Sequence, residues 1–367
     1  MKSIIEEALS KGSEPANALN SAGLISDDDK ELEEILKSLR TKIVVIGLGG
    51  AGSNTIDRMM REGITGVDMV AANTDAQHLL TIKAQKKILL GKRTTRGLGA
   101  GAVPAIGEKA AKEAEEELRS VIKGADMVFV TCGLGGGSGT GSSSFVAQLA
   151  KEEGALTIAV VSTPFAAEGL ARQKNAAWGL DRLRRVADTV IVIPNDKLIE
   201  LVPRLPLDKA FKVADEILMR SITGITEIIT KPGLVNLDFN DLKTIMKGSG
   251  VAMIGMGQSE AMGENRALEA IEEAINSPMI EADISEATGV LVNVTGGADM
   301  TVAEAQRVAE EIQKRVSKNA RIIWGASVDP TLEHSLKVMV VITGVKSKQI
   351  VGKNDMPVKS DVMDVVS

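Results

Sequence analysis

Three glycine-rich stretches have the clearest capacity for chemistry in this sequence, and each directly follows a short apolar run. In the first, GLGGAGSNT, the glycines Gly47, Gly49 and Gly52 have the spacing of a dinucleotide-binding fingerprint. Glycine lets the backbone turn sharply and approach a phosphate, and the helix expected next would supply N–H donors. Taken alone, this stretch fits a bare strand-to-helix turn, a phosphate site or the cofactor site of a nicotinamide-dependent dehydrogenase.

The second stretch, CGLGGGSGTGSSS, is the most informative. Six glycines fall within nine positions: Gly133, Gly135, Gly136, Gly137, Gly139 and Gly141. Each costs roughly 0.5–1 kcal/mol relative to alanine, and a reason in packing alone is hard to find. Successive N–H groups of such a run can surround phosphate oxygens, while Ser138, Thr140 and Ser142 can donate hydroxyls or reach a magnesium ion. The stretch therefore predicts phosphate binding without the lysine of a Walker loop, because no Gly-Lys-Ser/Thr follows.

The third stretch, RGLGAG at residues 96–101, follows the apolar run KKILL. Ligands of open α/β sheets bind at the carboxyl ends of the strands, so three such turns on one parallel sheet would converge there. Three converging loops suit a triphosphate.

A pair of carboxylates, Asp238 and Asp241, lies three residues apart at an expected helix start, so both can face one direction. The simpler interpretation is that Asp238 caps the helix. Nothing in the local sequence explains why the pair should meet a nucleotide, because the preceding helix would carry the chain to the opposite end of the sheet.

The elements that must position these residues follow from the apolar pattern. Strands are expected at 42–46, 67–72, 86–90, 126–131, 155–162 and 189–193, with helical spacing between them, notably at 108–122 and 171–187. Strands that are apolar on both faces and separated by helices predict a doubly wound parallel α/β sheet.

A helix of about 25 residues is expected at 207–231, long enough to span ~37 Å between two domains. Strands expected at 251–255, 289–295, 320–324 and 336–345, with helices at 264–275 and 302–316, predict a second, smaller α/β layer. The expected organisation is an acidic extension with one short helix (1–40), a nucleotide-binding domain (41–206), the central helix (207–231), a second domain (232–347) and a polar tail (348–367).

Composition narrows the classes of function. With one cysteine and two histidines in 367 residues, neither a disulfide framework nor a Cys/His zinc cluster can form within one chain, and Cys132 is expected to be buried and structural. A net charge of −6 and 2% aromatics make nucleic acid a poor partner. No run approaches the ~18 uncharged apolar residues of a membrane span. We expect a cytoplasmic protein without direct membrane insertion.

The motifs GGGSGTGS and NLDFNDLKTIM together resemble the tubulin/FtsZ superfamily, and within it the FtsZ family of prokaryotic cell-division GTPases. The sequence most resembles the archaeal members of that family. The likeness covers residues 41–345 and includes GGAGSNT, ANTDAQ, TRGLGAG, PFAAEG, IPNDKL, AFKVADE, GVAMIG and ATGVLVNVTGG. It implies a parallel-sheet GTPase domain joined by a long central helix to a smaller α/β activation domain.

The resemblance also implies GTP or GDP as the nucleotide, with Mg²⁺, and assigns no protein side chain as a metal ligand. By position, the implied nucleotide-binding residues are Gly49, Gly50, Ala51, Gly52, Asn54, Asn73, Asp75, Gly99, Ala100, Gly101, Gly135, Gly136, Gly137, Ser138, Gly139, Thr140, Gly141, Glu168, Arg172, Asn195, Phe211 and Asp215. Chemistry agrees for the base, because guanine N1–H and N2–H₂ are adjacent donors that a carboxylate such as Asp215 can accept. Phe211, four residues earlier, can stack on the base, although its spacing also fits an ordinary core residue.

For hydrolysis the resemblance implies head-to-tail filaments, in which Asp238, Asp241 and Asn236 of one subunit complete the pocket of the next. We expect Asp238 and Asp241 to orient and polarise the water that attacks the γ-phosphate in line, with Asn236 shaping the loop. The implied role is an assembly-activated GTPase of the division ring at mid-cell. Besides itself, the implied partner is a membrane-tether protein that engages a terminal tail.

Departures from the family pattern affect two places. Ser138 stands where threonine is usual, Ser142 to Ser144 replace Ser-Ala-Pro, and the tail GKNDMPVKSDVMDVVS does not show the peptide by which bacterial members recruit tethers. Two alternatives remain open. A nicotinamide-dependent dehydrogenase leaves the second glycine stretch unexplained, and a nucleotide-dependent scaffold or shape-control filament would polymerise with weak hydrolysis.

Overall fold

The computed structural model describes residues 41–201, 206–230, 235, 238–261, 265–280 and 283–345. The expected acidic extension with its helix, the polar tail and Asn236 lie outside the described residues. The described residues all belong to one compact unit.

The first half of this unit, residues 41–201, is built on parallel strands that lie where the apolar runs predict them. They are β1 (Ile43–Leu48), β2 (Asp68–Asn73), β3 (Lys86–Leu89), β4 (Met127–Gly133), β5 (Leu156–Thr163) and β6 (Thr189–Pro194). Their order in the sheet is β3-β2-β1-β4-β5-β6, and every neighbouring pair is parallel. The carboxyl ends that follow these strands therefore share one edge.

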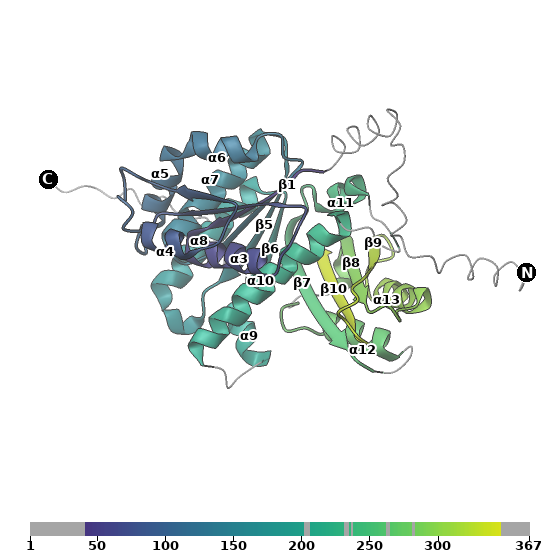
Figure 1. Ribbon diagram of the computed structural model, residues 1–367. Coiled ribbons are helices and arrows are strands. Elements are labelled where there is room, and N and C mark those ends of the chain that lie inside the picture. The colour runs from purple at the N-terminus through teal and green to yellow at the C-terminus, as the bar shows by residue number, and fades with distance from the viewer. Residues whose placement is uncertain are drawn as a thin grey trace, which may run out of the picture. The chain divides into compact units, whose positions relative to one another are not determined.

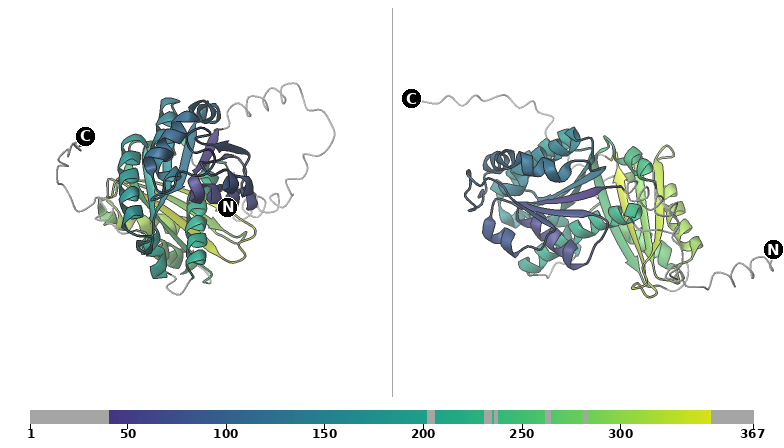
Figure 2. Two further views of the ribbon diagram at one scale, coloured as in Figure 1. Left: turned by 90° about the vertical axis from the view of Figure 1, so that its left-hand side faces the viewer. Right: turned by 45° about the horizontal axis from the view of Figure 1, so that its top comes forward.

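Helices cover both faces of this sheet (Figures 1 and 2). They are α3 (Gly49–Arg61), α4 (Ala76–Thr81), α5 (Pro104–Glu113), α6 (Glu115–Ile122), α7 (Ser138–Glu152), α8 (Leu170–Val186), α9 (Asn195–Leu201) and α10 (Leu207–Thr230). Ile56 of α3 and Ile222 of α10 pack in the core on one face, and Val146 of α7 and Leu183 of α8 pack in the core on the other. The predicted doubly wound arrangement is confirmed.

One predicted helix is wrong in its extent, because 108–122 is divided between α5 and α6. Helix α5 starts earlier, with Pro104 in its first turn, where proline lacks only an N–H that has no partner there. It ends at Glu113, whose carboxylate accepts hydrogen bonds from the N–H groups of Arg93 and Thr94, 2.7 and 3.1 Å away. These contacts with a distant loop are not visible in the local pattern.

The second half, residues 238–345, adds four strands and three helices to the described fold. They are α11 (Phe239–Met246), β7 (Gly250–Ser259), α12 (Asn265–Ile275), β8 (Gly289–Gly296), α13 (Val302–Arg315), β9 (Arg321–Val328) and β10 (Leu336–Thr343). Short 3-10 helices occur at η2 (Ala166–Glu168) and η3 (Ile284–Glu286).

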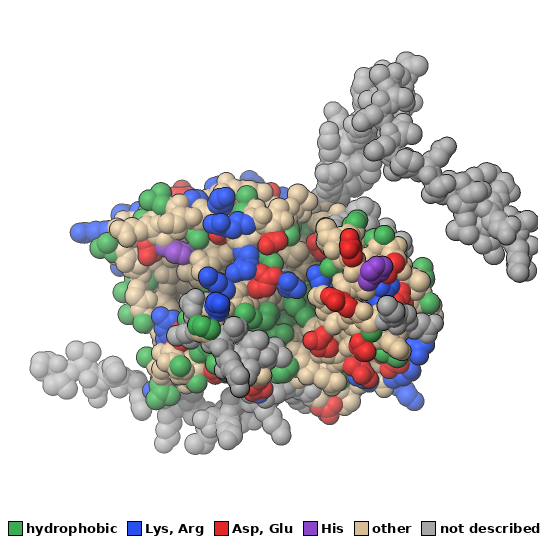
Figure 3. Space-filling view, turned by 60° about the horizontal axis from the view of Figure 1, so that its bottom comes forward, with side chains coloured by type: hydrophobic (Ala, Val, Ile, Leu, Met, Phe, Trp, Pro, Cys, Tyr) green, Lys and Arg blue, Asp and Glu red, His purple; other side chains and the backbone are tan. Residues whose placement is uncertain are grey.

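The two halves share a single ten-stranded sheet, which continues from β6 through β7, β10 and β8 to β9. Strand β7 is parallel to β6 but pairs over only three residues, starting with Gly250 opposite Thr189, whereas β10 is antiparallel to both β7 and β8. On one face a hollow separates the halves (Figure 3), a cavity of about 610 Å³ between α10 and the strands β7 and β10. Because the sheet is continuous from β6 to β7, the second layer is an extension of the first sheet.

Helix α10 crosses from the carboxyl edge of the sheet to its amino edge. In its first half Glu216 accepts a 2.7 Å hydrogen bond from Arg58 of α3. At its end Thr230 lies against Gly66, just before β2 begins; a Cβ on Gly66 would be 3.1 Å from Thr230 Cβ. At about 1.5 Å per residue its 24 residues span ~36 Å. No described helix is both long and apolar enough to cross a membrane.

Candidate functional site

The first glycine stretch forms the turn from β1 into α3. Gly49 has a φ of +70°, and a Cβ there would lie 2.7 Å from the Gly139 nitrogen, so this turn contacts the second stretch. A Cβ on Gly52 would lie 2.3 Å from the Thr131 carbonyl oxygen, so Gly52 allows α3 to pack closely on β4. Gly50 faces open space, and α3 begins without a side-chain cap. The turn thus presents backbone N–H groups.

The second stretch connects β4 to α7, and packing accounts for part of its glycine content. Cβ atoms on Gly137 and Gly141 would lie 2.3 Å from the Gly101 oxygen and 1.9 Å from the Pro104 oxygen. Packing therefore does supply a reason for these two glycines, although a packing reason was expected to be hard to find. Gly136 differs, because it faces open space and its φ is not left-handed. Among the glycines at the centre of this loop, Gly136 is the one at which packing leaves room for a side chain.

The hydroxyls of the second stretch are held by the protein. Thr140 Oγ1 accepts a 2.8 Å hydrogen bond from the Gly135 nitrogen, and Ser138 Oγ lies 2.5 Å from Thr74 Oγ1 after β2. Ser142 is buried and donates to the Ser138 carbonyl oxygen at 2.6 Å. Ser142 is thus directed into α7, whereas Ser138 and Thr140 fix the shape of the loop.

The third stretch docks onto the other two. The Gly99 nitrogen donates to the Thr74 carbonyl oxygen at 3.0 Å, and the Gly137 nitrogen donates to the Gly101 carbonyl oxygen at 2.9 Å. Ala100 is buried, while Gly99 and Gly101 have positive φ and open space around them. The predicted convergence of three glycine turns at one edge of the sheet is confirmed.

Asn175 of α8 is a residue of this site that the sequence did not single out. Its amide donates to the carbonyl oxygens of Ala102 and Gly135, at 3.0 and 3.2 Å, and so joins the third stretch to the second. No motif marks an asparagine that bonds two distant loops.

The electrostatics of this edge favour an anion. Helices α3 and α7 both begin here without a side-chain cap, and the contact between Gly49 and Gly139 places the two starts side by side. The positive ends of two helix dipoles therefore face one place, which is the arrangement that binds phosphate groups.

A second cluster follows β5 and β6 at the same edge. Glu168 accepts hydrogen bonds from Arg172, at 2.7 Å, and from the Phe165 nitrogen, at 2.9 Å. A Cβ on Gly135 would lie 3.0 Å from the Arg172 oxygen, so this segment borders the second glycine stretch. Glu168 and Arg172 thus lie next to the second glycine stretch.

Aromatic and amide groups adjoin this segment. Phe211 of α10 is 38% exposed and packs edge-on against buried Phe165, with ring centroids 5.2 Å apart, so Phe211 is not an ordinary core residue. Asn195 is buried, and its Oδ1 has no hydrogen-bond partner among the described residues. The next residue, Asp196, accepts a 2.9 Å bond from the Ala166 nitrogen. Phe165, which sequence analysis left without a role, supports the exposed ring.

Asp215, one turn after Phe211 on α10, is the perturbed titratable group of this cluster. Burial raises the pKa of its carboxyl group to about 6, against the opposing effects of Arg58 and of a hydrogen bond from Asn54. Asp215 is half-buried, and a carboxylate in such a place suits a ligand that presents N–H donors.

Asn73 and Asp75 lie where β2 ends. Asn73 is buried and its Oδ1 accepts a 2.8 Å hydrogen bond from the Thr74 nitrogen, while Asp75 caps α4 through the His78 nitrogen at 3.0 Å. Both residues therefore shape the turn against which the third stretch docks.

The two expected catalytic carboxylates lie elsewhere. Asp238 is exposed and caps α11, its Oδ1 accepting from the Asn240 nitrogen at 3.0 Å, and Asp241 is exposed in the first turn. The other end of α11 lies at the start of β6, where Thr189 donates to the Met246 carbonyl oxygen. The capping interpretation of Asp238 is confirmed. A six-residue strand spans about 20 Å, so these carboxylates do not reach the glycine loops of their own chain.

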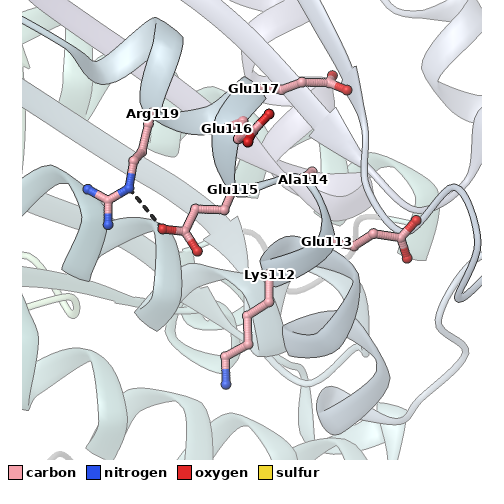
Figure 4. A pocket seen from close by; sticks show the side chains of 7 residues that line it. All are labelled: Lys112, Glu113, Ala114, Glu115, Glu116, Glu117 and Arg119. Atoms are coloured by element: carbon pink, nitrogen blue, oxygen red, sulfur yellow. Dashed lines mark hydrogen bonds and ion pairs between the residues drawn. The ribbon is translucent and has the colours of Figure 1, made fainter.

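Three further observations concern other groups of the described residues. Cys132 is buried, which raises the pKa of its thiol to about 12 and confirms its structural role. Among the described residues no group of three or more His, Cys, Asp or Glu could hold a metal ion. A groove of about 450 Å³ along α5 and α6 (Figure 4) contains Arg119, which pairs with Glu115 at 2.9 Å, and it lies away from the glycine turns.

Comparison with known proteins identifies relatives along almost the whole chain. Residues 42–203 match the model of the Tubulin/FtsZ family GTPase domain, and residues 250–346 match that of the FtsZ family C-terminal domain. Cell division protein FtsZ 1 of Archaeoglobus fulgidus is 56% identical over 358 residues, covering 98% of this chain and 97% of that protein. Cell division protein FtsZ of Haloferax mediterranei is 54% identical over 363 residues, covering 96% and 95%.

Solved structures agree. An FtsZ dimer from M. jannaschii superposes with a TM-score of 0.83 at 51% identity, covering 91% of this chain and 99% of that one. CetZ2 from Haloferax volcanii, at 24% identity and a TM-score of 0.73 over 84% and 95% of the chains, shares the fold.

Proposed function

The chain belongs to the tubulin/FtsZ family and is an FtsZ-type cell-division GTPase of the cytoskeleton, and from this premise we propose how its own residues bind and hydrolyse GTP. Family membership removes the dehydrogenase alternative and supports the three glycine turns as the place for the triphosphate. The observation that carries the proposal is that Asp238 and Asp241 are separated from these turns by about the length of strand β6.

Phosphate binding rests on the backbone. The starts of α3 and α7 offer N–H groups around Gly50 and Gly136, where open space would admit phosphate oxygens, and Gly99 and Gly101 close the γ-phosphate end. Ser138 and Thr140 keep the loop in shape through their bonds to Thr74 and Gly135. The absence of a Walker lysine is compatible with this arrangement because two helix dipoles supply positive potential.

Selection of guanine depends on hydrogen-bond acceptors of the protein. Asp215 would accept the N1–H and N2–H₂ of guanine, and the unpartnered Oδ1 of Asn195 is a further acceptor at the same edge. Phe211 would stack on the base from its exposed position against Phe165, and Glu168 with Arg172 would meet the ribose and phosphates. Adenine offers no such pair of adjacent donors.

Mg²⁺ accompanies the nucleotide in this proposal. The described donor set fits an ion held by phosphate oxygens and water rather than by side chains, since no described carboxylate cluster is present and Mg²⁺ ordinarily binds this way. When bound, the ion neutralises charge on the phosphates.

Hydrolysis needs a second subunit. Stacked head to tail, one subunit would place Asp238 and Asp241 over the glycine turns of the next, where their carboxylates orient and polarise the water that attacks the γ-phosphate. The helix starts stabilise the charge that develops on the phosphates as GDP leaves. Asn236 is assigned the shaping of that loop. Large apolar side chains exposed beside the glycine turns, Leu98 at 87%, Leu170 at 73% and Val103 at 47%, support a covering subunit. The heterologous contact repeats into a filament.

The remaining assignments belong to the same proposal. We place the filament in the cytoplasm at mid-cell, joined to the membrane by a tether protein that engages a terminal tail. We divide the chain at 41–206, 207–231 and 232–347, a division supported by the two separate family matches.

The deciding experiment is the GTPase rate per subunit as protein concentration rises, with light scattering recorded in parallel. A shared site predicts little hydrolysis below a threshold and a steep rise where scattering begins. A rate per subunit that does not change with concentration would place the complete site within one chain. Scattering without phosphate release would favour the weakly hydrolysing scaffold.

A further inference from the structure

Helix α11 begins with the two proposed catalytic carboxylates and ends against the start of β6 (Figure 1). Leu242 and Met246 of this helix are buried in one cluster with Leu156 of β5 and Leu291 of β8, so its apolar face packs against both halves of the sheet. Apolar packing is non-directional and by itself lets a helix slide or rotate on the surface that it covers. A directional contact at one end of α11 would fix where its first turn points.

The hydroxyl group of Thr189, the first residue of β6, makes such a contact. A hydroxyl carries one proton and a carbonyl oxygen can only accept, so Thr189 Oγ1 donates to the Met246 carbonyl oxygen. Met246 is the last residue of α11, and the final carbonyl groups of a helix have no partner within it. Ser249 Oγ, 2.8 Å from Thr189 Oγ1, is then the donor to the same hydroxyl. Thr189 and Met246 are both fully buried, so this bond is shielded from water.

The backbone that carries this hydroxyl is itself held in place. Asp188, the residue before Thr189, is buried, and its carboxylate pairs with Lys151 at the end of α7 and accepts a 3.0 Å hydrogen bond from the Thr157 nitrogen. The Asp188 carbonyl oxygen accepts from the Gly250 nitrogen at 3.2 Å, where β7 begins. Thr189 is therefore a fixed point of the first half, located where the three-residue pairing of β6 with β7 starts.

We propose that Thr189 is a positioning residue for hydrolysis, whose hydroxyl fixes the end of α11 and thereby the direction in which Asp238 and Asp241 project. The helix has eight residues and spans ~12 Å, so a shift at Met246 is carried to the first turn. The proposal rests on the proposed function, which assigns the two carboxylates to hydrolysis. It adds a residue that acts on them from the far end of their helix.

The other hydrogen bonds at the two ends of α11 are local. Asp238 caps the beginning of the helix through the nitrogen of a residue two positions further on. The Ser249 nitrogen lies 3.4 Å from the Met246 carbonyl oxygen, within the turn that follows the helix. Of these hydrogen bonds between described residues, the one from Thr189 joins the helix to the sheet.

Thr189→Val removes the hydroxyl and keeps the size of the side chain. We expect hydrolysis per polymerised subunit to fall about ten- to hundredfold, because displaced carboxylates no longer orient the attacking water, while GTP affinity is unchanged. Thr189→Ser keeps the hydroxyl and should restore most of the rate. Phosphate release, GTP titration and pelleting measure hydrolysis, affinity and polymer.

Thr226→Val is the matched control. Thr226 is also buried, but its hydroxyl donates at 3.0 Å to the Thr223 carbonyl oxygen within its own helix, α10. The two valine variants lose the same group from a buried place, and thermal melts compare their stabilities. Thr226→Val should keep the wild-type rate of hydrolysis.

A double-mutant cycle tests whether Thr189 acts through the carboxylates. In a chain that carries Asp238→Asn and Asp241→Asn, adding Thr189→Val should cause no further loss of hydrolysis, because no carboxylate is left to misplace. Radiolabelled GTP at equal amounts of polymer measures the low rates of this background. A further loss by the same factor as in the wild-type background would show that Thr189 acts independently of the carboxylates, and would overturn the proposal.

The outcomes separate this proposal from the proposed function. If removing both carboxylates leaves hydrolysis unchanged, the proposed function fails, and the role of Thr189 fails with it. If their removal abolishes hydrolysis while folded Thr189→Val keeps the wild-type rate, the proposed function stands and the role of Thr189 is overturned. Should Thr189→Val not fold, Ser249→Ala decides, because it removes the hydroxyl that donates to Thr189. A loss of hydrolysis that disappears in the carboxylate-free background supports the proposal, and an unchanged rate overturns it.

Discussion

At the scale of single residues, the proposed role of Asp215 predicts that nucleotide binding depends on pH. Burial holds its pKa at about 6, above the usual value of 3.8, so the free protein takes up a proton there as the pH falls through that value. The ionised form accepts the guanine donors, so GTP affinity is fully present above pH 6 and is lost below it, by about tenfold per pH unit. Titrations of GTP between pH 5 and pH 8 measure this dependence.

Asp215→Asn is the control for that dependence. An amide has no carboxyl proton to gain and presents donors to guanine, so the variant should bind GTP more weakly by ~1–3 kcal/mol at pH 7.5 and show a flat profile near pH 6. An equally steep loss of affinity in this variant would assign the titration to another group.

The glycines of the second stretch divide into two kinds that substitution can separate. Gly136→Ala places a methyl group in open space, so stability should hold while GTP affinity falls on the order of tenfold, because N–H contacts to charged oxygens are obstructed. Gly137→Ala places its methyl group 2.3 Å from the Gly101 oxygen and should destabilise the fold by about 1–3 kcal/mol. Thermal melts alongside GTP titrations separate the two effects. Unchanged GTP affinity in Gly136→Ala would exclude close phosphate approach there.

At the scale of elements, α11 carries a carboxylate with two duties, as helix cap and as proposed catalytic group. Asp238→Asn keeps the cap, because asparagine is an equally good N-cap, but removes the charge. GTP binding and assembly should persist while hydrolysis falls roughly 10²–10⁴-fold. Asp238→Ala loses the cap as well and should unfold more easily by about 1 kcal/mol.

Mixing tests whether that carboxylate acts on a neighbour. Asp238→Asn subunits titrated into wild type at fixed total protein should copolymerise and silence the GTP of the adjoining wild-type subunit. Phosphate release should then fall below the line expected from dilution, with pelleting to confirm mixed polymers. A linear fall in copolymers would mean that each chain hydrolyses its own nucleotide.

Secondary-structure elements could be predicted where a single pattern of apolar residues determines them. The strands β1, β2, β4, β5 and β6 are buried almost throughout, and the length of α10 follows from apolar residues at spacings of three and four. The break between α5 and α6 was not predictable, because it depends on Glu113 contacting Arg93 and Thr94 in a separate loop. Glycine motifs likewise predicted the convergence of the three turns, whereas Phe165 and Asn175 acquire their places only through residues distant in sequence.

At the scale of the whole molecule, one core connects the halves. Ile222 of α10 is buried in the same cluster as Ile158 of β5 and Val341 of β10, and the sheet is continuous from β6 to β7. The two tryptophans can report on the unfolding of the two halves separately, because Trp178 lies in α8 and Trp324 lies in β9. Single-tryptophan variants, Trp178→Phe and Trp324→Phe, should show coincident midpoints in urea once corrected for their own stability by circular dichroism.

Separate midpoints would contradict a single cooperative unit and would indicate that the three-residue pairing between β6 and β7 opens first. Ile222→Ala adds a check, because the fully buried side chain should cost about 2–5 kcal/mol and shift both reporters together.

In the proposed head-to-tail filament, the position of α10, with glycine turns at its beginning and α11 beyond its end, also determines how many bound nucleotides can be hydrolysed. A row of subunits has one junction fewer than it has nucleotides, so the subunit whose glycine turns are uncovered keeps its GTP intact. A dimer can hydrolyse half of its GTP, and a long filament nearly all of it. The fraction of bound GTP that can be hydrolysed thus rises with filament length. Short filaments retain proportionally more GTP, and no separate length-sensing mechanism is required.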